Sequence, residues 1–393
     1  MPSGKGQIQR VSVPIANYLL SLKDLGYSFR LNEAGDVLEV NGHRLDDNDL
    51  AKIRAEMREE GFTNVAAVED VLRREAFMHR YHPIKTYLTC AGLSYDGGQH
   101  ISHLAGYFED TTLPFPLFGT WLRKWLIGAV AKAMNGSHSQ NAMLVLDGPQ
   151  GIGKSYFARW LCAPMADYFL DDAINTSDKD SVVRLATYWI WEVGELGATM
   201  RRADVEALKA FISRQVVSVR KPYARIDMVK PALASLIGTV NNSAGILADQ
   251  TGNRRFLVAT INSIDWDYVQ AVDQTQMWGE AFTAYSQGET WYLSGGERAQ
   301  SEENNAAYRV PNPIEGYLTK YFVIDAHNTT EWSSTGDIVA RLFDMGYKGQ
   351  STRSVAMEVA ATLSEMGLVK LRKRVGGNPV WGYSGIWAGM NVP

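Results

Sequence analysis

One octapeptide constrains the fold of this chain more than any other feature. Residues 148–155 read GPQGIGKS, which matches the pattern GxxxxGK(S/T). The apolar run MLVLD precedes it and the amphipathic stretch SYFARWL follows, so the glycines join a buried strand to a helix. Such glycines let backbone N–H groups wrap phosphate oxygens, and the helix N-terminus adds positive partial charge. Lys154 can then reach the β- and γ-phosphates, and Ser155 can bind Mg²⁺.

The loop therefore predicts a site for ATP and Mg²⁺ within an α/β fold. From about residue 137 to 265, apolar strands alternate with amphipathic helices, which is the pattern of a parallel sheet covered by helices. The predicted core is a P-loop NTPase domain with a parallel sheet. The residues predicted to bind the nucleotide are Gly148, Pro149, Gln150, Gly151, Ile152, Gly153, Lys154 and Ser155.

A second apolar strand carries an acid that such a site requires. TYWIW is followed directly by Glu192, which lies 38 residues past Lys154. Parallel strands present their carboxyl ends at one edge of a sheet, so Glu192 is predicted to meet Mg²⁺ together with Ser155. Glu195 is placed to orient or deprotonate the attacking water. A solvated carboxylate is the alternative interpretation of each glutamate.

Two further polar groups follow apolar runs downstream. The strand ALASLIGTV ends on Asn241 and Asn242, where an amide can contact the γ-phosphate, although a turn is an equally ordinary use of such a pair. Arg254 and Arg255 precede the run FLVATI, on a loop that Gly252 opens. Their alternative interpretation is a pair of surface arginines.

The segment between the acid and the asparagines is strongly basic. Residues 201–230 contain eight Lys or Arg and three Asp or Glu, a net charge of +5 in a chain whose total is −4. VVSVRKPYARIDM alternates like a hairpin and could offer phosphate contacts and one stacking surface. The candidate DNA-binding residues are Arg220, Lys221, Tyr223 and Arg225. A solvated charged face is the alternative.

Taken in order, these segments resemble a known family. GPQGIGKS, WIWEVGEL, FISRQVVSVRKPYAR, IGTVNN and TGNRRF look like the virulence-associated protein E group, which comprises phage- and island-encoded proteins similar to superfamily 3 helicases of the AAA+ class. The resemblance covers about residues 80 to 265. It implies a hexameric ring, ATP bound between subunits, and single-stranded DNA drawn through the centre.

The resemblance also implies individual roles. It places Lys154 and Ser155 on ATP·Mg²⁺, Glu192 as the Walker B acid, Asn241 as the sensor, Arg254 or Arg255 as the arginine finger, and Arg220, Lys221 and Arg225 on the DNA-contacting hairpin. One departure matters. Many AAA+ motors carry two adjacent acids, but Val193 and Gly194 follow Glu192 here. Whether Glu192 or Glu195 is the catalytic acid therefore stays open.

Three domains are expected along the chain. Residues 1–110 are predicted to form a small α-rich module that serves as an oligomerisation collar, 111–290 the AAA+ core, and 291–393 a winged-helix-like domain. The last domain has a net charge of +4 over residues 341–374 and a predicted hairpin at Gly376-Gly377. A lid that touches no DNA is its alternative role. The polar stretch GERAQSEENNAAYR is predicted to be a linker or an exposed helix.

The composition limits the compartment and the partners. With 46% hydrophobic and 21% charged residues, the chain is ordinarily globular, and its two cysteines are too few for a disulfide framework. The start MPSGKGQIQR lacks an apolar signal core, and the longest apolar stretch is interrupted by charges, so no membrane contact is expected. The predicted location is the cytoplasm of a bacterial host. The paired histidines, His79 with His82 and His100 with His103, are expected to be structural because no Cys or acid cluster joins them.

Three functions compete. The leading one is an ATP-driven DNA helicase, a ring motor acting on single-stranded or forked DNA in phage or mobile-element replication. The alternative is an AAA+ initiator or loader that hydrolyses ATP without processive unwinding. A small-molecule P-loop kinase is disfavoured by the basic hairpin and by Arg254-Arg255. Related proteins often carry a primase or polymerase module, whereas residues 1–110 are too short for one, so either a separate primase partner or a longer parent chain is expected.

Overall fold

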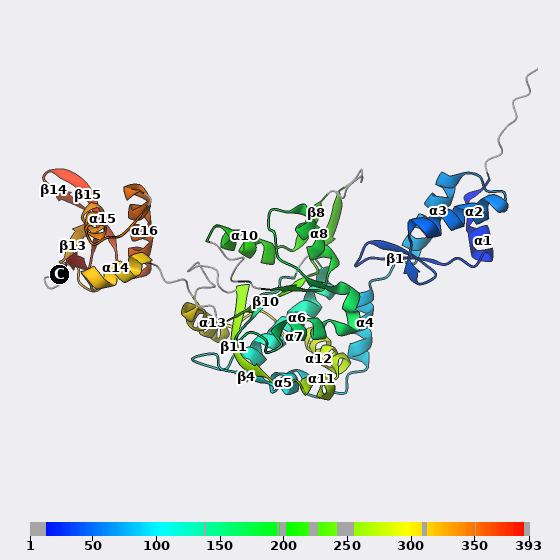
Figure 1. Cartoon of the computed structure of the whole chain (residues 1–393), viewed down its shortest axis with the longest axis horizontal. Coiled ribbons are helices and arrows are strands. Elements are labelled where there is room, and N and C mark those ends of the chain that lie inside the picture. Colours follow the sequence, from blue (N-terminus) through cyan, green and yellow to red (C-terminus); the bar gives the residue numbers. More distant parts are fainter. Residues whose placement is uncertain are drawn as a thin grey trace, which may run out of the picture. The chain divides into compact units, whose positions relative to one another are not determined.

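The computed structural model describes residues 13–136, 139–194, 196, 202–219, 227–241, 255–308, 313–349 and 351–388. The chain forms two compact units, Met1–Arg309 and Val310–Pro393 (Figure 1). The predicted C-terminal domain begins at residue 291, whereas the second unit begins at Val310. No helix among the described residues is long and apolar enough to cross a membrane.

The first unit starts with a small module that has its own apolar core. Its elements are α1 (Ile15–Asp24), β1 (Phe29–Asn32), β2 (Val37–Val40), β3 (His43–Arg44), α2 (Asp47–Glu59) and α3 (Val65–Met78). Leu22, Ile53 and Leu72 are fully or almost fully buried within it. Asn41 and Gly42 both have positive φ, at 50° and 86°, which closes the β2–β3 hairpin as expected for an Asn-Gly turn.

Two helices that the sequence assigns to this module belong instead to the sheet that follows. They are α4 (Pro83–Leu93) and α5 (His100–Ala105). Their apolar faces, including Leu88 and Leu104, are buried in the same cluster as Trp121 and Trp125. A Cβ on Gly279 would lie 2.5 Å from the Ala91 carbonyl oxygen, so this glycine permits the close packing of α4 on a later helix. The sequence assigned residues 1–110 to one module because nothing in these two segments identifies the surface that they cover.

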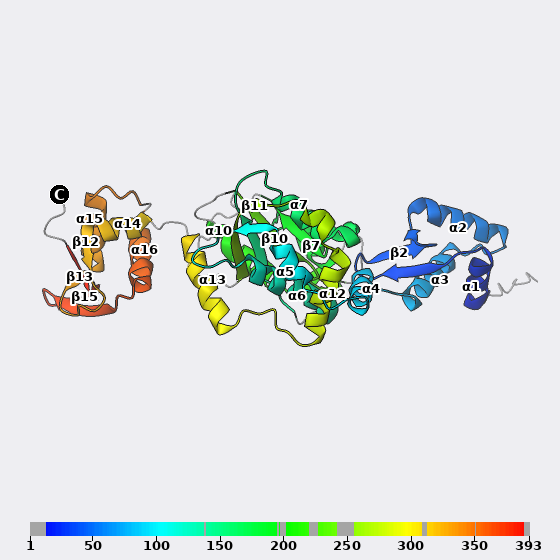
Figure 2. The ribbon, with the colours of Figure 1, turned by 90° about the horizontal axis from the view of Figure 1, so that it is seen from below.

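A six-stranded sheet forms the centre of the first unit. Its strands, in order across the sheet, are β4 (Phe108–Asp110), β11 (Phe256–Ile264), β5 (Met143–Asp147), β10 (Ser235–Val240), β7 (Ile190–Val193) and β6 (Phe169–Asp171). Strands β11, β5, β10, β7 and β6 are parallel, and β4 is antiparallel to β11. Figure 2 labels β11, β10 and β7 in this order across the sheet, and β5 lies between β11 and β10. The predicted α/β class with a parallel sheet is therefore confirmed, and the carboxyl ends of β5, β10 and β7 meet at one edge.

Helices cover both faces of this sheet. One face carries α4, α5, α6 (Phe118–Asn135), α7 (Lys154–Leu161) and α12 (Gln274–Ser286), and the other carries α8 (Lys179–Thr187) and α10 (Arg202–Ile212). Along β5, Leu144 and Leu146 enter the first cluster, whereas Met143 and Val145 enter the second. Burial on both faces explains why this strand is a continuous apolar run. Two short elements complete the layer, the 3-10 helix η2 (Ala163–Tyr168) before β6 and α11 (Tyr268–Ala271) after β11.

The polar stretch near residue 300 is a helix that packs on the sheet, not a linker. It forms α13 (Gly295–Ala307), and its Asn304 and Asn305 side chains are buried. The Nδ2 atom of Asn304 donates to the Val258 carbonyl at 2.9 Å, and that of Asn305 donates to the Phe256 carbonyl at 3.3 Å. The asparagines thus satisfy backbone carbonyls of β11. The polar sequence of this stretch suggested solvent exposure, but these two amide side chains are buried with their hydrogen bonds satisfied.

Helix α6 contains a buried lysine whose protonation should make the free energy of unfolding depend on pH. Lys132 is 3% exposed, and its Nζ donates to the Ala234 carbonyl at 2.5 Å. Burial lowers the pKa of Lys132 to about 7. In the unfolded chain a lysine has a pKa of about 10.4. Between these values the unfolded state binds more protons, so the free energy of unfolding rises with pH, by up to about 1.4 kcal/mol per pH unit.

We therefore expect Lys132→Met to remove this dependence. Denaturant midpoints measured at pH 7 and pH 9 should differ less in the variant than in the wild type. Lys179→Met, at an exposed position on α8, is the matched control and should retain the wild-type difference. Equal pH dependence in Lys132→Met and the wild type would contradict the prediction.

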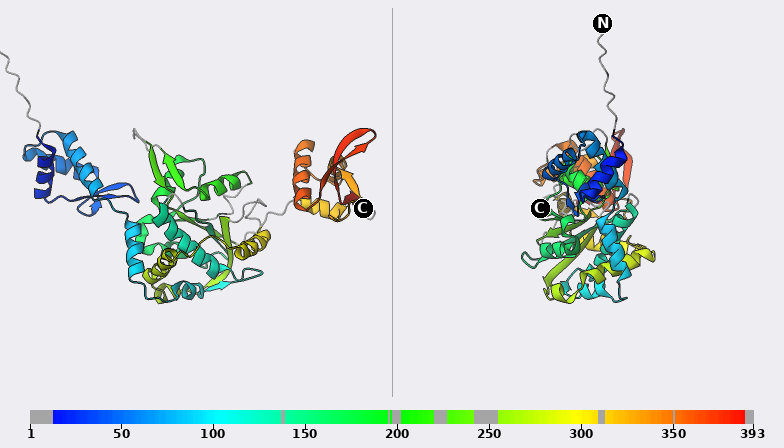
Figure 3. Two further views of the ribbon diagram at one scale, coloured as in Figure 1. Left: turned by 180° about the vertical axis from the view of Figure 1, so that it is seen from behind. Right: turned by 90° about the vertical axis from the view of Figure 1, so that its right-hand side faces the viewer.

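The C-terminal unit has a separate core. Its elements are α14 (Pro313–Tyr321), β12 (Phe322–Ile324), β13 (Trp332–Ser334), α15 (Thr335–Asp344), α16 (Thr352–Glu365), β14 (Lys370–Val375), β15 (Asn378–Ser384) and β16 (Ile386–Ala388). The predicted hairpin at Gly376-Gly377 is present as β14–β15, drawn in red in Figure 3. Every residue of β14 is exposed. The Lys370 Nζ atom and the Arg372 Cζ atom lie 5.5 Å and 5.8 Å from the ring centroid of Trp381.

Candidate nucleotide-binding site

The glycine-rich loop joins β5 to α7 as the sequence predicts. Strand β5 ends at Asp147 and α7 begins at Lys154. A Cβ on Gly148 would lie 1.9 Å from the Ile261 carbonyl oxygen, so only glycine fits where the loop passes β11. Gly153 has a φ of +107°, a conformation that side chains rarely adopt. The loop therefore requires glycine at position 148 because of the close contact with β11, and at position 153 because of the positive φ.

Lys154 points into the loop. It is 5% exposed, and its Nζ atom donates to the carbonyls of Gly148 at 2.8 Å and Pro149 at 2.6 Å and to Asn241 Oδ1 at 3.2 Å. Burial lowers the pKa of Lys154, and nearby Asp147 opposes that shift. Neutral oxygens thus hold the ammonium at the centre of the loop. A charged phosphate oxygen would be a stronger partner for this ammonium than the neutral oxygens are. Asn241, at the end of β10, is brought to the same point.

Glu192 lies beside the predicted metal ligand Ser155. It is 1% exposed on β7, its carboxylate accepts a hydrogen bond from Thr239, whose Oγ1 lies 3.4 Å from Glu192 Oε1, and the hydroxyl of Ser155 is close enough to stabilise the carboxylate. Burial raises the pKa of Glu192, while the hydroxyl of Ser155 favours the ionised form. A carboxylate and a hydroxyl close together next to a phosphate loop fit Mg²⁺, which takes one or two protein oxygens together with phosphates and waters. When bound, the ion would neutralise charge on the phosphates.

We expect Glu192→Gln to separate function from stability. The variant should lose most of the gain in ATP affinity that Mg²⁺ provides and hydrolyse ATP about 100-fold more slowly or worse. Because burial raises the pKa of Glu192, its ionised form destabilises the fold at neutral pH, so the variant should unfold at an equal or higher denaturant concentration. Asp172→Asn, at an exposed acid that pairs with Arg184, is the control and should alter neither activity nor Mg²⁺ dependence. Wild-type Mg²⁺ dependence in Glu192→Gln would contradict this role.

A cavity of about 340 Å³ opens at this edge of the sheet. Its lining comprises Gln150, Gly151, Gly153, Lys154, Ser155, Tyr156, Gly194, Thr239, Asn241 and Trp266. Ile152 of the loop packs instead against the apolar cluster that contains Leu144 and Trp121. Sequence reasoning did not select Thr239, Tyr156 or Trp266. Thr239 could have been predicted from the sequence because it lies two residues before Asn241 on the same strand. Trp266 could be assigned to the cavity only once the strand order, which places β11 next to β5, was known.

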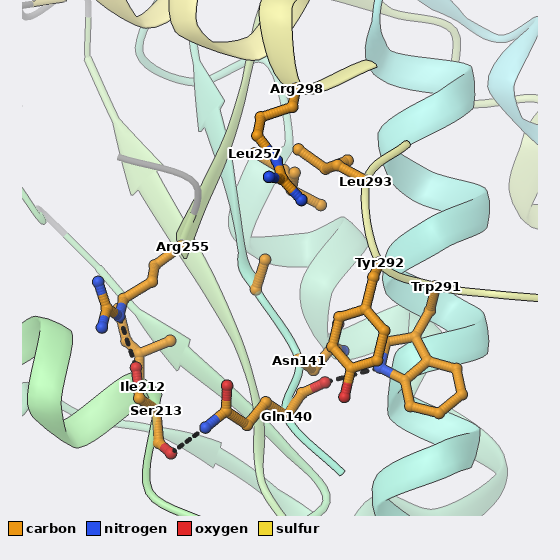
Figure 4. Close-up of a pocket in the computed structure, with 11 residues that line it drawn as sticks. Gln140, Asn141, Ile212, Ser213, Arg255, Leu257, Trp291, Tyr292, Leu293 and Arg298 are labelled. Atoms are coloured by element: carbon orange, nitrogen blue, oxygen red, sulfur yellow. Dashed lines mark hydrogen bonds between the residues drawn. The ribbon is translucent and has the colours of Figure 1, made fainter. Parts of the chain in front are cut away.

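Arg255 lies at the opposite edge of the sheet from the phosphate loop. It directly precedes β11, whose Phe256 is in register with Met143 and whose Thr260 is in register with Asp147. At about 3.3 Å per residue, Arg255 is about 16 Å along the strand direction from the level of Asp147, the last residue before the loop. Its Nε atom donates to Ser213 Oγ at 2.5 Å, at a separate cavity of about 280 Å³ that Arg298 also lines (Figure 4). Arg255 therefore does not join the site of its own chain.

Several predicted residues lie outside the described part of the chain. They are Glu195, Arg254, Arg220, Lys221, Tyr223 and Arg225. The hairpin predicted to carry the basic residues is present: β8 (Val216–Val219) pairs antiparallel with β9 (Met228–Pro231). Val219 is in register with Met228, so residues 220–227 connect the two strands.

The histidine pairs have local partners. His79 contacts Glu75 at 3.2 Å and His100 contacts Asp96 at 2.8 Å. The His82 side chain accepts a hydrogen bond from the Lys85 N–H at the start of α4, and burial lowers its pKa to about 4. Within the described ranges, no group of three or more His, Cys, Asp or Glu could hold a metal ion.

Comparison with known proteins gives a family and a fold. A family model described as the virulence-associated protein E-like domain matches residues 91–310, more than half of the chain. The A form apo structure of the NrS-1 C-terminal region, residues 305–718, is 13% identical with a TM-score of 0.50, over 96% of this chain and 99% of that one. Another apo structure of the same region is 11% identical with a TM-score of 0.44, over 96% and 99%. No curated protein sequence matches significantly. At such identities, the likeness at a TM-score of 0.50 concerns the fold alone.

Proposed function

This chain belongs to the virulence-associated protein E-like domain family, and from that membership and the geometry of its phosphate loop we propose that it is an ATP-dependent DNA helicase of phage or mobile-element replication. One observation carries the proposal. Ser155 lies close to Glu192 and next to Lys154, at the edge where β5, β10 and β7 end. This is the arrangement that binding and hydrolysis of Mg²⁺·ATP require.

In this proposal each group has a defined task. The loop amides and Lys154 bind the β- and γ-phosphates, and Ser155 and Glu192 hold Mg²⁺ between them. Asn241, on the strand between the P-loop strand and the acid strand, senses the γ-phosphate. Either Glu192 or Glu195 orients the attacking water. The core is then an AAA+ domain of the superfamily 3 type.

The proposed oligomer is a ring, with six subunits as the expected number. Arg255 supports it, because this arginine lies at the sheet edge that is far from its own phosphate loop. A ring can place that edge against the loop of the next subunit, so that Arg254 or Arg255 reaches a neighbouring γ-phosphate. Hydrolysis then depends on assembly, as a ring motor requires.

Two basic hairpins support DNA as the substrate. The β8–β9 hairpin carries the segment of Arg220, Lys221, Tyr223 and Arg225, which we propose contacts single-stranded DNA. In the C-terminal unit, Lys370 and Arg372 of β14 lie over the ring of Trp381, a residue that is 52% exposed. Cations beside an exposed ring suit a sugar–phosphate backbone. We propose that this unit is a winged-helix-like DNA-binding domain.

The remaining partners follow from this function. A helicase of this kind works with a primase or polymerase, and we propose a separate protein in that role. The cytoplasm of a bacterial host is the proposed location.

A forked duplex with a single-stranded tail tests the proposed function. The wild-type protein should separate the strands with Mg²⁺·ATP and should not do so with a non-hydrolysable analogue or when Lys154 is replaced by Ala. DNA-stimulated ATP hydrolysis without strand separation would instead assign the chain to the initiators or loaders. Absence of nucleotide binding and hydrolysis, with and without DNA, would contradict both functions.

A further inference from the structure

We propose that Trp266 and Tyr156 form a stacking subsite for the base of the bound nucleoside triphosphate. The proposal rests on the proposed function, because it assumes that the phosphate loop binds a triphosphate. Both residues line the cavity that Lys154 and Ser155 also line. Their side chains carry no charge, so they complement the part of the ligand that the phosphate loop does not recognise.

The two rings form one exposed aromatic surface. Their centroids are 4.9 Å apart and their planes are inclined by 46°. Trp266 is 48% exposed and Tyr156 is 44% exposed, so each ring packs on the other and still offers area to a ligand. Aromatic rings bind bases by stacking, which contributes about 1–3 kcal/mol per base.

The backbone holds Trp266 in place although its side chain is exposed. It lies between the end of β11 and the start of α11, flanked by the buried residues Ile264 and Tyr268. The Asp265 N–H donates to the Tyr107 carbonyl at 2.8 Å, and the Val269 N–H donates to the Trp266 carbonyl at 3.1 Å. A side chain fixed at its base in this way is pre-organised for a ligand, which reduces the entropy lost on binding.

The ring lies directly against the phosphate loop. A Cβ on Gly153 would be 2.6 Å from the Trp266 ring, so the glycine before Lys154 leaves room for the indole. Tyr156 follows Ser155 on the first turn of α7. The aromatic pair therefore begins where the phosphate-binding residues end, which is where the ribose and base of a bound nucleotide must leave the loop.

The test compares Mg²⁺·ATP with inorganic tripolyphosphate, which has the phosphates and no base. Calorimetric titration should show that Trp266→Ala weakens ATP binding by about 5- to 150-fold, the range that corresponds to the loss of one stacked base. Tripolyphosphate affinity should change by less than about 2-fold, because the loop amides and Lys154 bind the phosphates. Trp266→Phe, which keeps a stacking ring, should recover most of the ATP affinity.

Matched controls distinguish stacking from support of the loop. Phe115→Ala removes another exposed aromatic side chain, one that does not line this cavity, and should leave both affinities unchanged. An equal loss of ATP and tripolyphosphate affinity in Trp266→Ala would show that the indole only supports Gly153, and unchanged ATP affinity would show that no base stacks there. Either result overturns the subsite while leaving the proposed ATPase intact. If the wild type bound neither compound, the proposed function itself would fail.

Discussion

Lys154→Ala should slow ATP hydrolysis by about 10²- to 10³-fold, the loss seen when one preorganised charge-stabilising donor is removed from an active site. The Nζ atom of Lys154 already lies within 2.8 Å of the Gly148 and Pro149 carbonyl oxygens, so it is held where the phosphates must bind. No other cationic side chain lines this cavity, as far as the described residues show. A steady-state ATPase assay measures the effect.

The same variant should remain folded. Burial lowers the pKa of Lys154, which means that the fold gains nothing from its charged form at neutral pH. Its denaturant midpoint should therefore stay close to that of the wild type. Lys179→Ala, at an exposed lysine of α8, is the control and should hydrolyse ATP normally. Hydrolysis by Lys154→Ala within about 2-fold of the wild type would remove the phosphate loop from the chemistry.

Arg255→Ala should bind ATP normally and hydrolyse it about 10³- to 10⁵-fold more slowly, if Arg255 is the arginine finger. A guanidinium is planar, always charged and a multiple donor, and these properties suit the charge that develops on a γ-phosphate. Because Arg255 precedes β11 and the loop follows β5, the arginine can act only on the site of another subunit. Arg254→Ala needs the same assay, since Arg254 is the other candidate.

Two variants control for local effects at Arg255. Arg298→Ala removes the other arginine that lines the same cavity and should hydrolyse ATP normally. Ser213→Ala removes the hydroxyl that accepts from Arg255 Nε, and it should matter far less than the loss of the guanidinium. If Ser213→Ala were as inactive as Arg255→Ala, the arginine would be holding α10 and not reaching a phosphate. Normal hydrolysis by both Arg254→Ala and Arg255→Ala would exclude an arginine finger in this pair.

Local features of the sequence predicted much of the fold. The Gly376-Gly377 turn and the strand–loop–helix around Lys154 both depend on a few neighbouring residues. In each case the turn or cap chemistry is complete within the segment. These elements are therefore present where the sequence places them.

Features that depend on distant partners were not predictable in the same way. The helices α4 and α5 carry ordinary amphipathic patterns, and only their burial against Trp121 and Trp125 assigns them to the sheet. The buried amides of Asn304 and Asn305 look like surface polarity until β11 supplies their acceptors.

The candidate site also contains residues that local sequence predicts and residues that only the fold identifies. The loop, Glu192 and Asn241 come from strand ends that the sequence marks, and the strand order brings them together. Trp266 follows a strand that lies on the other side of β5, and nothing in its neighbouring residues indicates a ligand. Arg255 was selected from the sequence as an arginine-finger candidate, and only the strand register shows that it lies at the sheet edge opposite its own loop.

A mixture of two inactive variants tests most directly the central claim that ATP is hydrolysed between two copies of this chain. Lys154→Ala lacks a working phosphate loop and retains Arg255, whereas Arg255→Ala retains the loop and lacks the arginine. In mixed assemblies some interfaces combine the intact loop of one variant with the intact arginine of the other, so ATPase activity should return to a measurable fraction of the wild-type rate. If activity stays at the sum of the two separate variants although native mass spectrometry shows mixed assemblies, the shared site is wrong.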